Sequence, residues 1–556
     1  MNIRTAASLL VLLLAVGIHR SASAQYEGIP HISDPVHQFL LRQQAAGALD
    51  HAFLQHLPLS ADEIRGYLDS IDESALTPTD RKLLEQFRGE RPLPGVDLAQ
   101  SLWDQLYRDG IHLISTRGDG YFVSLDPTLY LTAGRVSRPE GDDRHRTTFQ
   151  NTRGVRASGR IGEHLFFETR LEENQRRDAW PNYQRKTAPR LGGTKFYPES
   201  QEYDYWRAMG TVGVQTRFVD IRAGRDRNRW GDGLSSMFLS DYAPEYDQVQ
   251  IRTTFWRLQY INLYSAWTDY ASINRFSDHV LPRKYGALHA LAVNLPGRVQ
   301  LHFYESVTFA PDYEDDRRRG YDLSYLNPII FYRAVEIDRG SPDSMQLGAG
   351  ASWVPVPGLK LFAQGLLTEF NLDELLSGDG WFGNKWGVAG GFTYAPPSVS
   401  GLLVHFEHAR VRPFTYSHRD VETSFVHYND PLGHPAEQNF YDYTLHTSYQ
   451  PLERWSGRFT MHYTRRGRNP EGVNEGADPR LSYATRSRSH GHSIGQGIPV
   501  REMRVEMHAG YEVLPRLHLE IAARVESIND GESGRIWYVN PFAQLRWGIP
   551  FQSLRL

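Results

Sequence analysis

The sequence predicts an all-β transmembrane barrel of about 16–18 antiparallel strands, with a small N-terminal α-helical segment. Three observations favour this class. Segments with a hydrophobic period of two recur from about residue 111 to the end of the 556-residue chain. Their polar faces carry many charges, and long polar loops alternate with tight turns. A soluble β-sandwich shares the period of two, but strands of about ten residues with aromatic side chains near their ends favour the barrel.

The first residues have the features of a secretory signal. Arg4 supplies a positive charge, residues 6–17 are apolar, and Ala-Ser-Ala at 22–24 forms a cleavage site of the A-x-A type. We therefore expect residues 1–24 to be a signal peptide and the mature protein to be exported. After residue 20 no apolar run approaches the ~20 residues of a membrane-spanning helix. The chain has no cysteine, so neither disulfides nor a lipid anchor on cysteine are expected.

Residues 25–110 are expected to form a periplasmic helical segment or plug. Leu49, Phe53 and Leu57 recur at the four-residue spacing of a helix face. The segment 60–63 (Ser-Ala-Asp-Glu) has the form of a capping box, and Thr77-Pro78 is a typical helix start. Short amphipathic helices of this kind need a larger surface on which to pack.

Residues 111–556 are expected to form the barrel. The clearest alternation lies near the C-terminus, in the segments 503–513, 517–525 and 543–551, and shorter examples lie at 165–171, 299–303, 402–406 and 459–463. Long polar loops are expected at 138–153, 175–200, 312–320 and 469–497, and a tight turn at 514–516. A barrel of this size is wide enough to enclose a lumen.

One stretch, Gly224–Asp247, fits neither a helix face nor a plain strand. It combines glycines at 224, 231 and 233 with three arginines and a tryptophan. The glycines would let the backbone turn sharply or approach another group closely. Guanidinium forks and an indole face could bind a ligand, or could shape a folded constriction in the barrel.

Four sequence blocks together resemble a known family. They are GRDRNRWGDG at 224–233, GYDLSYLNP at 320–328, WFGNK at 381–385 and RPFTYSHRD at 412–420. In this order they resemble the Wzi-type capsule assembly proteins, in the form found in Bacteroidota-like bacteria. The chain departs from typical barrels by ending on residues 553–556 without a terminal aromatic, and its helical segment matches the family only in character.

The resemblance implies an 18-stranded outer-membrane barrel whose periplasmic mouth is blocked by N-terminal helices. It also implies a non-catalytic role in holding polysaccharide on the cell exterior. Some relatives look like gliding-motility accessory proteins, which gives one alternative function. A sugar-selective outer-membrane porin with an open lumen is the other.

Eight residues have side chains suited to binding a glycan, because aromatic faces and hydrogen-bond donors hold sugar rings, hydroxyls and carboxylates. They are Arg225, Arg227, Arg229, Trp230, Arg412, Tyr416, His418 and Arg419. The competing interpretation is that the same residues belong to inward-folded loops and lumen-wall ion pairs that close the barrel. We favour this second interpretation for 224–247, with its arginines pairing with lumen carboxylates such as Asp226, Asp232 or Asp247. The polysaccharide would then lie on extracellular loops.

Metal, cofactor and catalytic sites are not predicted. His418, His427 and His434 recur with Asp420 and Asp430 nearby, but a metal site needs these side chains to converge, which spacing across strands and loops does not guarantee. The acidic run at 312–316 lacks the spacing of a calcium loop.

The chain also lacks a G-x-S-x-G nucleophile elbow, a P-loop and a strongly basic domain, which argues against lipase, nucleotide and nucleic-acid functions. The expected partners are extracellular polysaccharide and outer-membrane lipid. The sequence leaves the polymer and the oligomeric state open.

Overall fold

The computed structural model describes most of the chain. The described residues are 31–89, 106–107, 109, 111–137, 147–178, 194–197, 199–268, 281–311, 320–328, 332 and 343–549. The predicted signal peptide, the middles of three predicted long loops and the C-terminal residues 553–556 lie outside them. None of the described helices is long and apolar enough to cross a membrane.

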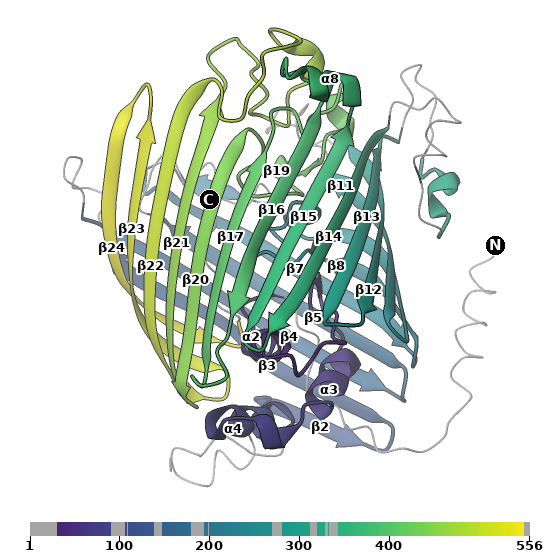
Figure 1. Ribbon diagram of the computed structural model, residues 1–556. Coiled ribbons are helices and arrows are strands. Elements are labelled where there is room, and N and C mark those ends of the chain that lie inside the picture. Colours follow the sequence, from purple (N-terminus) through teal and green to yellow (C-terminus); the bar gives the residue numbers. More distant parts are fainter. Residues whose placement is uncertain are drawn as a thin grey trace.

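The chain forms a closed antiparallel barrel with 18 main strands (Figure 1). The strands are β3 (Tyr121–Arg135), β4 (Thr147–Ile161), β5 (Leu165–Arg177), β7 (Glu202–Gln215), β8 (Val219–Asp226), β10 (Tyr246–Phe255), β11 (Leu258–Thr268), β12 (Arg283–Leu295), β13 (Val299–Phe309), β14 (Ser344–Val356), β15 (Leu359–Glu369), β16 (Lys385–Tyr394), β17 (Leu402–Val411), β20 (Phe440–Leu452), β21 (Trp455–Arg468), β22 (Ile498–Leu514), β23 (Leu517–Asp530) and β24 (Gly534–Trp547). The barrel closes where β24 pairs with β3, with Leu545 opposite Leu131. Short strands β2 (Ile114–Gly118) and β6 (Lys195–Tyr197) add to β3 and β7. The predicted fold class is confirmed.

Alternate side chains of each strand face lipid and lumen, as the period of two predicts. In β23, Leu519 and Ile521 are 50% and 69% exposed, whereas Glu520 between them is 3% exposed. An apolar outer face and a polar inner face are what a barrel in a bilayer requires, because lipid cannot solvate charges.

The charged inner faces pair with one another across the wall. Glu520 accepts from Arg458 at 2.6 Å and from Arg546 at 2.8 Å, and Glu506 accepts from Arg524 at 2.6 Å. A buried charge is tolerated only where an opposite charge and hydrogen bonds replace its lost hydration. The wall between β21 and β24 is therefore a network of ion pairs.

The N-terminal segment forms three helices with a core of their own: α2 (Pro35–Ala45), α3 (Ala61–Asp69) and α4 (Pro78–Phe87). A short 3₁₀ turn, η1 (Glu73–Ala75), joins the last two. The predicted capping box is present, since Ser60 and Glu63 exchange hydrogen bonds, and Thr77 caps α4. We call residues 31–89 the plug. The assignment of residues 25–110 and 111–556 to separate domains stays a prediction.

The helical conformation predicted for residues 49–57 is wrong. The structure has turns there, followed by a two-residue strand, β1 (His56–Leu57). Leu49, Phe53 and Leu57 are nonetheless buried. The backbone leaves the helical path because β1 pairs with a strand from a distant loop, β9 (Arg229–Trp230). Tertiary pairing overrides the local pattern.

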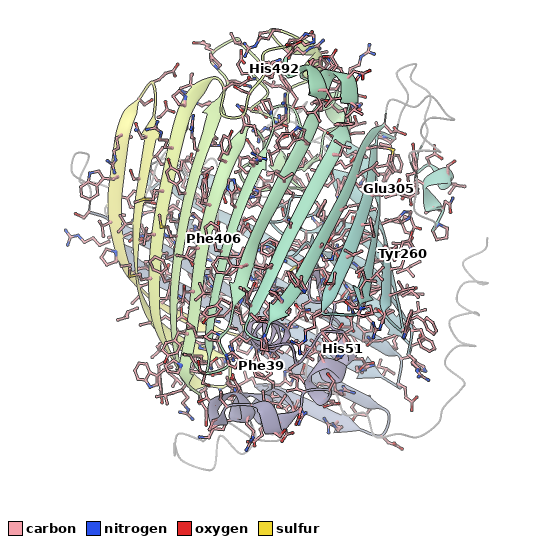
Figure 2. All side chains as sticks on the ribbon, viewed as in Figure 1. Phe39, His51, Tyr260, Glu305, Phe406 and His492 are labelled. Atoms are coloured by element: carbon pink, nitrogen blue, oxygen red, sulfur yellow. The ribbon has the colours of Figure 1, made fainter. Side chains whose placement is uncertain are left out.

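The plug lies at the rim of short turns, where Figure 2 labels its residues Phe39 and His51. Its Ala45 carbonyl accepts from Gly358 at 2.8 Å, Thr77 hydrogen-bonds Ser400 at 2.7 Å, and Lys82 pairs with Glu453 at 3.1 Å. The opposite rim carries the long loops and the helix α8 (Leu372–Ser377) (Figure 1). Short turns face the periplasm and long loops face outward in outer-membrane barrels. The position of the plug is consistent with the expected periplasmic side, which stays a prediction.

Candidate functional site

Two of the long connections fold into the barrel. We call residues 227–245 the first inward loop and residues 412–439 the second inward loop. The first reaches the plug, because β9 pairs antiparallel with β1 and the Gly231 amide donates to the Gln55 carbonyl at 3.0 Å. Trp230 is 1% exposed. A connection between two wall strands thus forms a two-stranded sheet with strand β1 of the plug.

Glycines permit this path, as predicted. Gly231 has φ of 133°, a conformation that side chains with a Cβ rarely adopt. A Cβ on Gly233 would lie 2.1 Å from Oε2 of Glu407 on the wall strand β17. The absence of side chains therefore lets the loop backbone touch the wall.

Asp232 ties the first inward loop to the wall and to the plug. Its carboxylate accepts from Lys360 Nζ at 2.6 Å and lies 2.7 Å from His302 Nε2. Lys360 also donates to Gln44 of the plug at 2.8 Å. Burial acts to raise the pKa of Asp232, but the charges of Lys360 and His302 outweigh it and hold that pKa well below its usual range.

The second inward loop packs on the first. The Tyr416 hydroxyl donates to the Met237 carbonyl at 2.9 Å, and the Ser240 amide donates to the Leu432 carbonyl at 2.7 Å. The loop carries η4 (Val421–Thr423) and a hairpin of β18 (Val426–His427) and β19 (Asp430–Pro431). Its apolar residues share one buried core with Trp230 and the wall. The plug and the two inward loops therefore fill much of the lumen with packed side chains.

His427 is a fully bonded neutral histidine in this core. Its Nδ1 accepts from the Thr268 amide at 2.8 Å, and its Nε2 donates to the Glu245 carbonyl at 3.3 Å. Burial lowers the pKa of His427 to about 3, and the charges of Lys284 and Arg225 add to that effect. The hydrogen-bond pattern requires an unprotonated Nδ1, which agrees with the lowered pKa.

The candidate residues of the first block are separated by the structure. Arg225 lies on the outward-facing side of β8, where it approaches the exposed Asp247 at 3.8 Å. Arg227 pairs with Glu245 at 3.4 Å and donates to the Asp241 carbonyl at 2.9 Å. Arg229 is buried and donates to the Gly231 carbonyl at 3.1 Å. Trp230 belongs to the core.

The predicted pairing of these arginines with lumen carboxylates is therefore correct in part. Arg225 meets Asp247 as predicted, but on the outer face, because strand register places both on the outward set of side chains. Asp232 pairs with Lys360 and His302 instead of with an arginine.

The candidate residues of the second inward loop also differ in their surroundings. Arg412 donates to the carbonyls of Trp381 at 3.1 Å and His492 at 3.4 Å, so it holds the outer loops together. Tyr416 is buried between the inward loops. His418 hydrogen-bonds Thr423 at 2.7 Å, and burial lowers its pKa to about 4. Arg419 is exposed at the outer rim, and it alone of the eight candidates is exposed.

Aromatic and cationic side chains gather around Arg412 at the outer rim. We call this surface the outer-rim platform, and it consists of Trp381, Phe382, Arg419, Tyr483, Arg486 and Arg488. The Arg486 guanidinium lies 3.7 Å from the Phe382 ring centre, and the rings of Phe382 and Tyr483 lie 5.6 Å apart. Ser482 donates to the Arg419 carbonyl at 2.5 Å. The three outer connections 370–384, 412–439 and 469–497 are thus joined to one another.

Part of the outer-rim platform lies in segments that the sequence singles out. Trp381 and Phe382 lie in one of the family blocks, but Tyr483, Arg486 and Arg488 lie in a stretch predicted only as a polar loop. The available signal was the presence of aromatic and arginine residues within that loop. Nothing local to the sequence shows that it meets residues 381–382.

The fold and the site define the class of this protein: it is an outer-membrane β-barrel with an N-terminal helical plug and two loops folded into its lumen. Its outer face is apolar and its inner face is charged, and its place is the outer membrane.

Comparison with known proteins supports the fold. No protein-family model and no curated sequence matches the chain. Among solved structures, the chain is similar to Wzi from Escherichia coli, described as an outer-membrane, carbohydrate-binding β-barrel involved in group 1 capsule assembly. The match has a TM-score of 0.55 and 11% identity, over 95% of this chain and 100% of Wzi.

Two proteins of Pseudomonas aeruginosa match less well. The outer-membrane protein OprD of Pseudomonas aeruginosa has a TM-score of 0.39 at 13% identity, over 77% of this chain and 94% of OprD. OccK8 of the same organism has a TM-score of 0.41 at 10% identity, over 76% of this chain and 98% of OccK8. At these identities the similarities concern the fold alone.

Proposed function

We propose that this protein retains or organises surface polysaccharide, capsular or exopolysaccharide, without catalysing a reaction. The observation that carries the proposal is the combination of a filled lumen with a joined set of outer loops bearing aromatic and arginine side chains. A barrel of this kind offers a ligand its outer surface. The similarity of fold to Wzi, which is described as carbohydrate-binding, supports the same conclusion.

The filling of the lumen is the main argument against a porin. The plug, the first inward loop and the wall meet at Asp232, Lys360 and Gln44, which are all buried. The first inward loop also contacts β17, since the amides of Leu234 and Ser235 donate to Glu407 at 2.5 and 3.0 Å. Side chains bonded in this way do not move aside for a diffusing sugar without breaking buried polar contacts, each of which costs free energy.

The outer-rim platform has the chemistry of a glycan surface. Sugar rings stack on aromatic faces, and guanidinium groups donate to hydroxyl and carboxylate oxygens. Trp381 and Tyr483 are half-buried, which holds them in place while leaving surface for contact, and Arg419 is exposed. A repeating polymer can contact many barrels at once, so weak contacts at each barrel add up to firm retention.

Replacing Trp381 and Arg419 by alanine tests the proposal. We expect cells with the double variant to release polysaccharide into the medium. The purified variant should bind the same polymer about 30-fold more weakly, from ~1 kcal/mol lost at an aromatic contact and a similar loss at Arg419. Trp256→Ala is a matched control, because Trp256 is 79% exposed at a periplasmic turn. Unchanged retention and binding in the double variant would contradict the proposed surface.

Conductance across a planar bilayer distinguishes the porin. The proposal predicts little steady current through the wild-type barrel, since the plug and the inward loops remain docked. A large steady current, together with retention that survives deletion of the gene, would replace the retention function with a channel function.

A further inference from the structure

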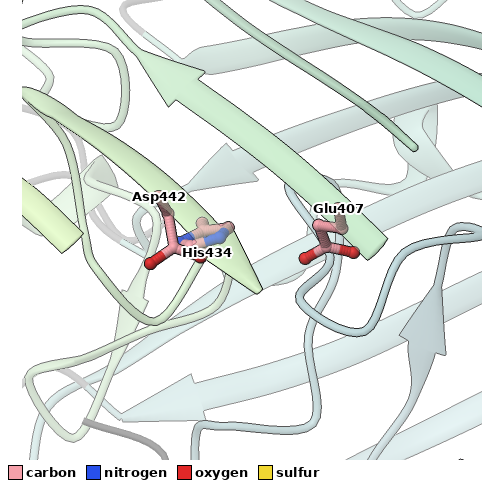
Figure 3. A group of neighbouring side chains, drawn as sticks. All are labelled: Glu407, His434 and Asp442. Atoms are coloured by element: carbon pink, nitrogen blue, oxygen red, sulfur yellow. The ribbon is translucent and has the colours of Figure 1, made fainter. Parts of the chain in front are cut away.

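Three side chains with metal-ligating atoms meet inside the barrel, apart from the outer-rim platform. They are Glu407 of β17, His434 of the second inward loop and Asp442 of β20 (Figure 3). One ligand atom of each lies within 4.8 Å of the others, and the three residues are 0%, 2% and 4% exposed. The cluster therefore joins two wall strands to a loop that fills the lumen.

The two carboxylates of this cluster differ from most others in the lumen. Other buried carboxylates pair with an arginine or a lysine; examples are Glu172, Asp220, Asp232, Glu245, Glu502, Glu506, Glu520 and Glu526. Within 4.0 Å, neither Glu407 nor Asp442 has such a partner in the part of the chain that the structure describes. Glu407 approaches only an imidazole, His405, at 3.6 Å. Two neighbouring buried carboxylates without a fixed cation call for a bound cation or for protons.

Hydrogen bonds from outside the cluster hold both carboxylates in place. Glu407 accepts from the amides of Leu234 and Ser235 in the first inward loop. Asp442 accepts from the hydroxyls of Thr464 at 2.5 Å and Thr444 at 3.3 Å. Such contacts are typical around metal ligands, where they fix the orientation of the coordinating oxygens.

The geometry and the donor set suit a small divalent ion. Three atoms within 4.8 Å of one another have a common point no more than about 2.8 Å from each (4.8/√3), so modest side-chain rotations reach the roughly 2.0–2.2 Å of Zn²⁺ bonds to nitrogen and oxygen. Two carboxylates and one imidazole suit Zn²⁺ or Mn²⁺, whereas Ca²⁺ takes about six to eight oxygens.

We propose that Glu407, His434 and Asp442 form a binding site for a divalent transition-metal ion. The ion clips the second inward loop to β17 and β20. Because Glu407 also accepts from the first inward loop, the same ion stabilises the docking of both loops. The site is independent of the polysaccharide surface and lies away from it in the fold.

Protons are the competing occupant. The Ala436 amide donates to Nδ1 of His434 at 3.1 Å, which leaves the proton of a neutral imidazole on Nε2, where it can serve a carboxylate. Coordination through Nδ1 replaces this contact, and coordination through Nε2 displaces the proton. Metal and proton therefore exclude each other, and the metal content of the protein tells them apart.

The test uses the purified full-length barrel in detergent. The protein is stripped with a chelator, equilibrated with ZnCl₂ or MnCl₂, freed of unbound metal and analysed for metal by mass spectrometry. We expect one equivalent of metal per chain and a thermal unfolding midpoint that rises with metal concentration. Three variants should each lose both the bound metal and the metal-dependent rise of the unfolding midpoint: Glu407→Gln, Asp442→Asn and His434→Ala. The control His418→Ala, in the same loop as His434, should keep both.

Two results would overturn the site. One is a wild-type barrel that holds no stoichiometric metal with either salt. The other is a full equivalent of metal in all three variants, which would place the ion elsewhere. If a variant fails to fold, as judged by circular dichroism, the wild-type stoichiometry and the anomalous X-ray signal of its crystals at the zinc or manganese edge decide the question.

Discussion

The buried contact between Asp232 and Lys360 gives the most direct test of the filled lumen. The change Asp232→Asn keeps the size of the side chain and removes its charge. The Lys360 ammonium, which is 4% exposed, then keeps the Gln44 oxygen at 2.8 Å as its contact with the plug. His302, which is fully buried, loses its carboxylate partner as well.

The size of the effect follows from the burial of both partners. Removing one member of a buried ion pair typically costs about 3–5 kcal/mol, because the remaining charge keeps its desolvation penalty. At 1.4 kcal/mol per factor of ten, the ratio of docked to undocked loop falls by about 10²- to 4 × 10³-fold. A salt bridge on the surface is worth only about 0–1 kcal/mol, so the outer-face pair of half-buried Arg225 and exposed Asp247 provides the contrast.

Conductance and proteolysis measure the result. We expect Asp232→Asn to show frequent channel openings in a planar bilayer and faster cleavage within residues 227–245 by added protease. Asp247→Asn is the matched control and should behave as the wild type. The double variant Asp232→Asn with Lys360→Met removes both charges and should regain much of the closed state.

A folded Asp232→Asn variant that stays closed and resists protease like the wild type would contradict this role of Asp232. The first inward loop would then be held by its apolar core alone. A double variant that stays open despite Lys360→Met would show that the unpaired ammonium is not the cause of opening.

Three further predictions concern the inward loops. Acidification should loosen the second one, because burial lowers the pKa of His427 to about 3 while an undocked imidazole titrates at its ordinary 6.5. The free energy by which neutral His427 stabilises the docked loop is complete above pH 6.5 and falls by about 2 kcal/mol by pH 5. Once corrected for the intrinsic pH dependence of exchange, hydrogen exchange of residues 412–439 should therefore accelerate as pH falls. Corrected exchange rates that do not change with pH would contradict this. Gly233→Ala places a Cβ against the Glu407 carboxylate and should lower the stability by about 1–3 kcal/mol. Gly66→Ala, in α3 with open space around the added Cβ and no positive φ, should not lower it. Trp230→Ala empties a fully buried site and should cost about 3–5 kcal/mol in thermal unfolding in detergent; a loss below 1 kcal/mol would count against a packed lumen.

The strands could be predicted because each carries its own signal. In β23, Leu519 and Ile521 alternate with Glu520, and this alternation predicts which face of the strand contacts lipid. The same alternation is the signal for the other wall strands. The helix starts at Ser60 and Thr77 were also readable, since a cap involves residues only three apart.

The predictions that were wrong concern contacts between distant residues. The segment 49–57 has helical spacing, yet His56 and Leu57 pair with Trp230 and Arg229. The register of β8 against β10 turns Arg225 outward, although its sequence neighbours 224–233 suggested a lumen position. A register shift of one residue reverses every side chain, and no local pattern determines it within an irregular stretch.

The sequence by itself determined the period of the strands, the alternation of long and short connections, and the amphipathic faces of the plug, because these depend on residues a few positions apart. The tertiary structure decided which loops fold inward, that Asp232 meets Lys360 across 128 residues, and that His434 meets Glu407 and Asp442. Closing the barrel brings these groups together. Because an unpaired buried charge is strongly destabilising, the charged side chains that meet in the lumen need partners that compensate their charge.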